Sequence, residues 1–288
     1  MFKKLFTTLC TAAMALSLTG CTAGLTDETS ATATTETTES TEKKVYRIGM
    51  ECDYAPNNWQ EDEATDTNLP ISNLDGFYAE GYDIQMAKLI AKELDCEIEI
   101  VKLAWTGLIQ ALKEGQIDMI IAGMGDTAER KESIAFSDTY SVHKTEYVLV
   151  VKADSKYANA TSIQDFSGAT VIGQVNTYYD SAIDQIEGVN HATPATDVPN
   201  MTSQLEEGLV DALVLDIDTA DSKYGDDADY KVLEFTDENG FTVDMTGSCV
   251  GMRLEDTDLV AQVNEALSHI DTDTRATLME EAKANMPK

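Results

Sequence analysis

Residues 120–138, IIAGMGDTAERKESIAFSD, contain residue types suited to binding an anion. Gly123 and Gly125 lack a Cβ, so a ligand or another backbone can approach them closely. Thr127 is a good N-cap, which places Arg130 in the first turn of a helix. Free N–H groups at a helix start and a guanidinium together form a compact anion site. The local sequence alone slightly favours the alternative, an exposed arginine paired with a neighbouring glutamate, because such pairs are common.

The elements that position these residues follow from hydrophobic periodicity. Residues 118–122 form an apolar run that suits a strand covered on both faces. The same reasoning predicts strands at 45–50 and 96–103, and helices at 81–95, 106–115, about 256–270 and about 273–285. A second strand–helix series begins near residue 169, whereas the polar residues 60–75 predict a long loop. Strands that alternate with helices predict βαβ units and parallel sheets.

The first 44 residues indicate export and anchoring rather than a part of the fold. Two lysines precede an apolar stretch, residues 5–18, that is short for a membrane span. LTGC, residues 18–21, resembles the bacterial lipobox, in which the cysteine is lipidated. We therefore expect a lipoprotein signal peptide at 1–20 and Cys21 as the lipid anchor, with an ordinary cleaved signal as the alternative. Residues 21–44 would hold this cysteine and a disordered tether, rich in Thr, Ser, Ala and Glu, that is too polar to form a core.

Charge and cysteine content limit the partners. The formal net charge of −32 argues against nucleic acid and anionic membrane surfaces, and mildly against a doubly acidic ligand. Cys52, Cys96 and Cys249 remain once the signal and anchor are set aside. Their number and spacing form neither a disulfide framework nor a metal motif. We expect buried thiols, leave one disulfide open, and expect neither a metal site nor a cofactor.

With these elements placed, residues 45–288 resemble the polar amino-acid substrate-binding proteins of bacterial ATP-binding cassette importers. The matching stretches are ECDYAPNNW (51–59), GYDIQMAKLIAKEL (81–94), WTGLIQALKEGQIDMIIAGMGDTAERKESIAFSDTY (105–140), GATVIGQVNTYYDSAIDQI (168–186) and GLVDALVLDIDTA (208–220). The resemblance implies an α/β, two-lobed, periplasmic-binding-protein-like (type II) fold. Each lobe is then a mainly parallel sheet flanked by helices, and two crossing strands join the lobes. Lobe 1 would comprise residues 45–139, lobe 2 with the hinge strands residues 140–248, and residues 249–288 would return to lobe 1.

The resemblance also implies a site for one free amino acid between the lobes. Arg130 would clamp the ligand α-carboxylate beside the backbone of the two glycines. Thr177 and Tyr178, at the start of a helix in lobe 2, would complete the carboxylate site. Asp216, which ends the apolar strand ALVL, would bind the α-ammonium. By itself Asp216 would be interpreted as a strand-end or N-cap residue.

The resemblance further implies residues that would contact the ligand side chain. Tyr54 and Trp105 match aromatic positions that line the cleft, and their alternative is an ordinary core role. Glu51 matches an acidic position that binds polar side chains, and its alternative is a solvated strand residue. A carboxylate there favours arginine, lysine or histidine, then glutamine, with cystine behind, and repels a second carboxylate.

Three positions depart from the family pattern. Gly125 stands where Ser or Thr is usual, so one hydroxyl donor to the carboxylate is missing. Asn57 stands where an aromatic residue is usual, and Asn176 replaces a common glycine. These departures bear on the side-chain pocket more than on the clamp for the backbone of the ligand.

The resulting prediction is an extracytoplasmic, lipid-anchored, monomeric receptor that delivers an amino acid to the permease subunits of an importer at the bacterial cell membrane. The first rival is an enzyme of the same fold, similar to a cyclohexadienyl dehydratase. It would need a poised acid or base, and His143, His191 and His269 are scattered along the chain. The second rival is a non-transport amino-acid sensor lipoprotein.

Overall fold

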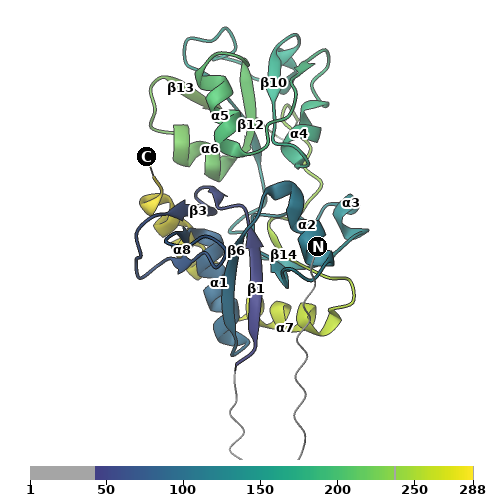
Figure 1. Cartoon of the computed structure of the whole chain (residues 1–288). Coiled ribbons are helices and arrows are strands. Elements are labelled where there is room, and N and C mark those ends of the chain that lie inside the picture. The colour runs from purple at the N-terminus through teal and green to yellow at the C-terminus, as the bar shows by residue number, and fades with distance from the viewer. Residues whose placement is uncertain (1–42, 237, 288) are drawn as a thin grey trace, which may run out of the picture. The chain divides into compact units, whose positions relative to one another are not determined.

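Two five-stranded sheets, each flanked by helices, organise the residues that the structure describes (Figure 1). The computed structural model describes residues 43–236 and 238–287. The predicted signal peptide, the predicted anchor Cys21 and the predicted tether up to residue 42 lie outside them. Below, lobe 1 is the part built on the first sheet and lobe 2 the part built on the second.

Lobe 1 is built on a sheet in the order β6-β1-β7-β14-β8. Its strands are β1 (Val45–Met50), β6 (Glu97–Lys102), β7 (Met119–Ile120), β8 (Ala135–Thr139) and β14 (Cys249–Met252). Its helical elements are α1 (Tyr82–Glu93), the 3₁₀ turn η1 (Trp105–Gly107), α2 (Leu108–Lys113), α3 (Ala128–Lys131), α7 (Thr257–Ser268) and α8 (Thr272–Asn285). The apolar face predicted for the helix at 81–95 is buried in α1, where Ile84, Ala87 and Ile90 are at most 1% exposed. Hydrophobic burial therefore fixes which face of α1 meets the sheet.

Lobe 2 is built on a sheet in the order β11-β10-β12-β9-β13. Its strands are β9 (Tyr147–Lys152), β10 (Thr170–Ile172), β11 (Asn190–His191), β12 (Ala212–Asp216) and β13 (Tyr230–Leu233). Its helical elements are η2 (Ile163–Phe166), α4 (Tyr178–Ile183), α5 (Val198–Glu206) and α6 (Ile217–Tyr224). Residues 148–151 and 212–215 are at most 2% exposed. These continuous apolar runs are strands covered on both faces.

Each sheet combines parallel and antiparallel pairs. In lobe 1, β1 pairs in parallel with β6 and β7, whereas β14 pairs antiparallel with β7 and β8. In lobe 2, β10 pairs in parallel with β11 and β12, whereas β9 pairs antiparallel with β12 and β13. The antiparallel strands are those next to the connections between the lobes. The expectation of mainly parallel sheets therefore holds for the βαβ part of each lobe, and the sheets as wholes are mixed.

A four-stranded antiparallel sheet, β2-β3-β5-β4, overlaps the region expected to be one long loop. Its strands are β2 (Asp53–Tyr54), β3 (Asn58–Glu61), β4 (Leu69–Pro70) and β5 (Tyr78–Glu80). The prediction for residues 60–75 is thus wrong at residues 60–61 and 69–70. Hydrophobic periodicity does not reveal strands as short as two to four residues. Hydrogen bonds hold the intervening turn, because Glu80 Oε2 accepts from the hydroxyls of Thr65 (3.2 Å) and Thr67 (2.6 Å).

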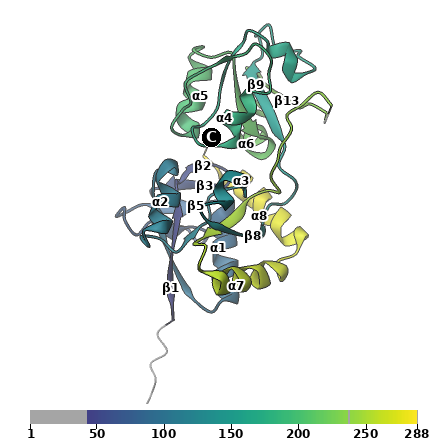
Figure 2. The ribbon, with the colours of Figure 1, turned by 90° about the vertical axis from the view of Figure 1, so that its right-hand side faces the viewer.

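Two extended segments join the lobes (Figure 2). One comprises residues 140–146, between β8 and β9, and the other leads from β13 to β14. They are bonded to each other at lobe 1: Tyr140 N donates to Ser248 O (2.9 Å), and Ser248 N donates to Ser141 Oγ (2.7 Å). No helix of the described residues is long and apolar enough to cross a membrane. Cys52, Cys96 and Cys249 are free thiols, which decides the open question of a disulfide among them.

Candidate ligand-binding site

One cavity between the lobes is lined by all nine residues that the sequence proposed for ligand binding. They are Glu51, Tyr54, Trp105, Gly123, Gly125, Arg130, Thr177, Tyr178 and Asp216. Lobe 1 contributes the first six and lobe 2 the last three. The structure therefore brings these residues together, and their contacts indicate what each can bind.

Arg130 presents a half-buried positive charge that has no carboxylate partner among the described residues. Thr127 is the N-cap of α3, and its side chain accepts from Arg130 N (3.3 Å). The guanidinium donates to the carbonyl oxygens of Gly125 (2.9 Å) and Asn176 (2.9 Å) and lies 5.1 Å from the centroid of the Trp105 ring. Burial lowers the pKa of Arg130. Among the described residues, no acid lies within ion-pair distance of Arg130. This geometry contradicts the alternative of an exposed pair with a neighbouring glutamate.

Asn176 explains one departure from the family pattern. Its φ is +57°, in the left-handed region where glycine is favoured and asparagine is tolerated better than most residues. In this conformation its carbonyl oxygen accepts from Arg130 Nη2 and from Trp105 Nε1 (3.3 Å). A backbone oxygen of lobe 2 thus links two side chains of lobe 1, and the asparagine keeps the turn that glycine usually makes.

Asp216 presents a negative charge bonded to neutral donors. It caps α6, and its Oδ1 accepts from Thr219 N (3.0 Å). Its Oδ2 accepts from the hydroxyls of Tyr54 (2.6 Å) and Tyr179 (2.7 Å). Burial, with the Asp216 charge, raises the pKa of both tyrosines, so both hydroxyls remain protonated donors. Within the part of the chain that the structure describes, no lysine, arginine or histidine lies within ion-pair distance of Asp216.

Glu51 follows β1 and is buried, with 4% of its surface exposed. This contradicts its alternative as a solvated strand residue. Its Oε2 accepts from Gln174 Nε2 of lobe 2 at 3.1 Å. Burial raises the pKa of Glu51 to about 7, and the bond from Gln174 only partly offsets this. A desolvated carboxylate with one neutral donor is suited to pairing with a cation.

The space beside the Cα of Gly125 is filled by the side chain of Met245. A Cβ on Gly125 would lie 1.7 Å from Met245 Cε. The sulfur of Met245 accepts from the hydroxyl of Tyr147 at 3.1 Å. Met245 lies on the second crossing segment and lines the cavity. A thioether therefore fills the space where a Ser or Thr side chain is usual in the family.

Thr177 and Tyr178 lie where α4 begins. Thr177 is the N-cap of α4, but its hydroxyl donates to Gln174 O (2.6 Å) rather than capping the helix. Tyr178 donates to Thr242 O of the second crossing segment (3.2 Å), and its ring lies 5.6 Å from that of Tyr147. Both residues line the cavity, and their hydrogen bonds are to lobe 2 and to the second crossing segment.

Sequence reasoning missed six cavity residues of consequence, which are His143, Tyr147, Gln174, Tyr179, Asp218 and Met245. Tyr179 directly follows Tyr178, and both line the cavity. Gln174 lies two residues after the end of β10. His143 lies in the first crossing segment, where no periodic pattern indicates the direction of a side chain.

Comparison with known proteins agrees with this geometry. The chain is 25% identical over 231 residues to an arginine-binding extracellular protein of Bacillus subtilis, covering 80% of this chain and 82% of that protein. It is 27% identical over 230 residues to a probable histidine-binding protein of Neisseria gonorrhoeae, covering 79% and 78%. The structure matches an amino-acid ABC transporter substrate-binding protein of Streptococcus pneumoniae bound to L-arginine, with 25% identity, a TM-score of 0.70, and coverage of 83% and 94%.

The family model of the bacterial extracellular solute-binding proteins, family 3, matches residues 46–282. That match spans both sheets and every residue of the candidate site. The chain therefore belongs to family 3 of the bacterial extracellular solute-binding proteins.

Proposed function

We propose that this protein is the solute-binding component of an amino-acid importer, and that it holds one free amino acid between its lobes. The observation that carries the proposal is a pair of opposite charges facing one cavity. Among the described residues, Arg130 of lobe 1 bonds only to carbonyl oxygens, and Asp216 of lobe 2 bonds only to hydroxyls and an N–H group. A zwitterion supplies the missing partner for each at once. Because the charges lie on opposite lobes, such a ligand favours the closed arrangement.

The ligand side chain is proposed to be basic, with glutamine next and cystine behind. Glu51 is a desolvated carboxylate in the same cavity, and a guanidinium, ammonium or imidazolium would restore a partner to its charge. Trp105 and Tyr54 provide aromatic surfaces beside it. The relatives that bind arginine or histidine support this choice. Glutamate and aspartate are expected to bind worst among the polar amino acids.

The protein is proposed to act outside the cytoplasm, anchored by a lipid to the bacterial cell membrane. Residues 1–20 would be a signal peptide, Cys21 the lipidated residue, and residues 21–44 the tether to the bacterial cell membrane. The division into residues 45–139, 140–248 and 249–288 is supported by the two sheets, each with its own buried cluster. The protein would act as a monomer and pass its ligand to permease subunits of the importer, without a cofactor.

A binding role fits the cavity better than an enzymatic one. His143 lines the cavity, but its Nδ1 lies 2.9 Å from Lys144 O and its Nε2 lies 3.1 Å from Asp218 Oδ2. Both ring nitrogens face acceptors, so neither has a free lone pair with which to take a proton from a substrate. We therefore propose that the bound amino acid leaves unchanged.

Calorimetric titration with the twenty amino acids and cystine tests this function. We expect a basic amino acid to bind tightest and to be recovered intact after incubation, as checked by NMR. Glutamate as the tightest ligand would overturn the side-chain assignment. Binding of no amino acid, or chemical conversion of one, would overturn the proposed function itself.

A further inference from the structure

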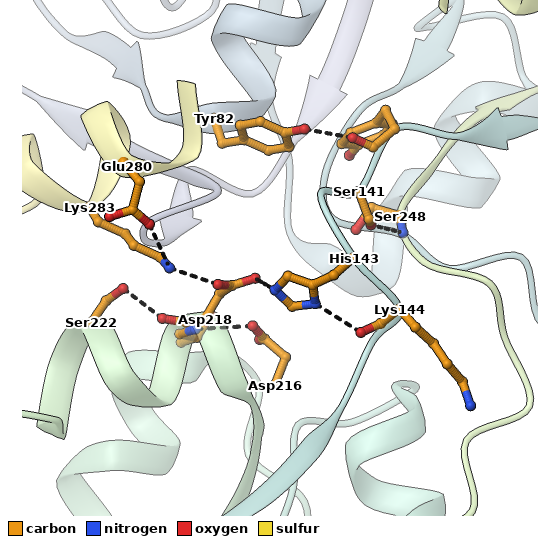
Figure 3. A network of polar contacts seen from close by, with 12 residues as sticks. Tyr82, Ser141, His143, Lys144, Asp216, Asp218, Ser222, Ser248, Glu280 and Lys283 are labelled. Carbon is orange, nitrogen blue, oxygen red and sulfur yellow. Dashed lines mark hydrogen bonds and ion pairs between the residues drawn. The ribbon is translucent and has the colours of Figure 1, made fainter. Parts of the chain in front are cut away.

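Asp218 lies two residues after Asp216 and also lines the cavity, but the protein itself satisfies its carboxylate (Figure 3). Its Oδ1 lies 2.8 Å from Lys283 Nζ, and its Oδ2 lies 3.1 Å from His143 Nε2. Asp218 is in α6 of lobe 2, Lys283 is in α8 of lobe 1, and His143 is in the first crossing segment. One carboxylate of lobe 2 is thus held by two cationic side chains that do not belong to that lobe.

The contacts of His143 favour a charged ring. Nδ1 lies 2.9 Å from the carbonyl oxygen of Lys144, which can only accept a hydrogen bond. Nε2 faces the carboxylate of Asp218, which also accepts. Both acceptors are best satisfied when both nitrogens carry a proton, which is the protonated imidazole. Burial lowers the pKa of His143, but the Lys144 carbonyl and the Asp218 carboxylate outweigh this and raise it overall, with a further contribution from Glu146.

The charges around Asp218 also favour its pairing with cationic side chains. Lys283 also lies 3.2 Å from Glu280 of its own helix, an acid whose side chain is 74% exposed. Burial lowers the pKa of Lys283, but the bond to Asp218 raises it overall. Asp221, one turn further along α6, adds a second negative charge near Lys283 and Asp218. The side chain of Asp218 is 19% exposed, so its two bonds are only partly screened by solvent.

We propose that His143, Asp218 and Lys283 form an interlobe latch that stabilises the closed arrangement in the absence of ligand and weakens as His143 loses its proton. The two neighbouring aspartates then have separate tasks. Asp216 is left to the ligand, whereas Asp218 is engaged by the protein. The latch goes beyond the proposed function, because it does not depend on which amino acid binds.

The direction of the pH effect follows from the two states. When the lobes separate, Asp218 moves away and the pKa of His143 returns towards its ordinary value of about 6.5. Closure therefore takes up a proton in the range between that value and the raised one. The contribution of His143 to the closed arrangement is fully present below about pH 6.5 and is lost as pH rises through the raised pKa.

The primary test removes the lysine, whose substitution leaves both cores intact. Lys283→Met in the full chain should make the ligand-free protein more open by small-angle X-ray scattering. Fluorescence of Trp105, whose Nε1 bonds to Asn176 O across the lobes, should shift in parallel. Because the pair is partly exposed, we expect the Kd for a ligand to rise about twofold to fivefold, mainly through faster dissociation. Glu280→Gln is the matched control, since it removes the other partner of Lys283 and keeps the bond to Asp218.

A pH series isolates the histidine. In a Glu51→Gln background, which removes a carboxylate that titrates near pH 7, the ligand-free protein should open as pH rises from 6 to 9. His143→Gln should be open across this range without a pH-dependent change. His191→Gln is the control, because His191 is likewise held between two carboxylates, but both belong to lobe 2.

Two results would overturn the latch: a ligand-free Lys283→Met protein that scatters as wild type does, or an opening with pH that survives His143→Gln. A double-mutant cycle with Asp218→Asn gives a further check, because the effects of Lys283→Met and Asp218→Asn should be less than additive. The scattering experiments contain no ligand. Their outcome is therefore independent of whether the protein binds amino acids.

Discussion

The hydroxyl of Tyr54 in lobe 1 lies 2.6 Å from Oδ2 of Asp216 in lobe 2. Tyr179 donates to the same oxygen, and Thr219 N donates to Oδ1. A carboxylate offers about four lone-pair positions, so one position remains for an ammonium group. The neutral donors hold Asp216 in place and leave its charge uncompensated. Tyr54 also packs in the buried cluster of lobe 2, so the same side chain joins the lobes by packing and by a hydrogen bond.

Removal of either end of the proposed zwitterion site should weaken binding of every amino acid. We expect Arg130→Ala and Asp216→Asn each to cost roughly 2–5 kcal/mol of binding free energy, because each leaves a desolvated ligand charge unpaired. Calorimetry measures the loss. Lys131→Ala is a suitable control for Arg130, since Lys131 is the next residue of α3 and pairs with Asp126 outside the cavity. Affinities of both variants within about threefold of wild type would show that the ligand binds elsewhere.

Glu51 should link binding of a basic ligand to pH. Its pKa is raised to about 7 by burial, so a cationic ligand must displace a proton below that pH. Affinity for a basic amino acid should therefore rise up to about tenfold per pH unit as pH increases towards 7, and then level off. Glu51→Gln should remove this dependence and weaken a basic ligand far more than glutamine. Affinity of the wild type that does not change between pH 5 and 7 would contradict the assignment.

The same carboxylate should reduce the stability of the ligand-free protein. The folded pKa of Glu51 lies above the unfolded one, so its contribution to stability is present below about pH 4.5 and is lost as pH rises to about 7. Glu51→Gln should thus raise the free energy of unfolding at pH 8 by up to about 3 kcal/mol, with the difference disappearing near pH 4. Urea unfolding at the two pH values measures it. A destabilised variant at pH 8 would mean that the buried charge has a partner.

Gly125 and Met245 should behave as a coupled pair. Gly125→Ser places a side chain where Met245 Cε lies, and should cost about 1–3 kcal/mol of stability. Met245→Ala makes the space, so the double variant should recover most of that loss and gain a hydroxyl near Arg130. Gly107→Ser is the control, because a Cβ there meets no atom within 4 Å. Additive effects of the two substitutions in thermal unfolding would argue against this coupling.

Cys21 should account for membrane attachment of the protein. In a bacterial host, the wild type is expected in the membrane fraction and should be labelled by a fatty-acid probe. Cys21→Ser should be released and unlabelled, since buried acyl chains contribute roughly 0.8 kcal/mol per CH₂. Cys96→Ser serves as the control at a cysteine within the fold. Continued labelling of Cys21→Ser would place the anchor at another residue.

The parts of the site that the sequence could predict are those governed by local rules. Local rules place Arg130 beside an N-cap and Asp216 at the end of a buried strand, whereas their proposed ligand roles come from the family resemblance. The roles of Met245 and His143 depend on two irregular segments, whose side-chain directions follow no period. Gln174 reaches Glu51 across 123 positions of the chain, a contact that no single stretch contains. The short strands β3 and β4, which overlap residues 60–75, were not predicted, because two to four residues are too few to show a period.

Each lobe has its own buried cluster, and the chain passes between the lobes only twice within the described residues. Two such cores can melt as separate cooperative units, so a single midpoint need not describe the ligand-free protein. A ligand bound to both lobes adds its binding energy to each unit and ties their unfolding together. Calorimetric scans should therefore change from a broad or double transition to one sharp transition as ligand is added. Ligand binding would then be detectable from the number of thermal transitions as well as from their midpoint temperatures.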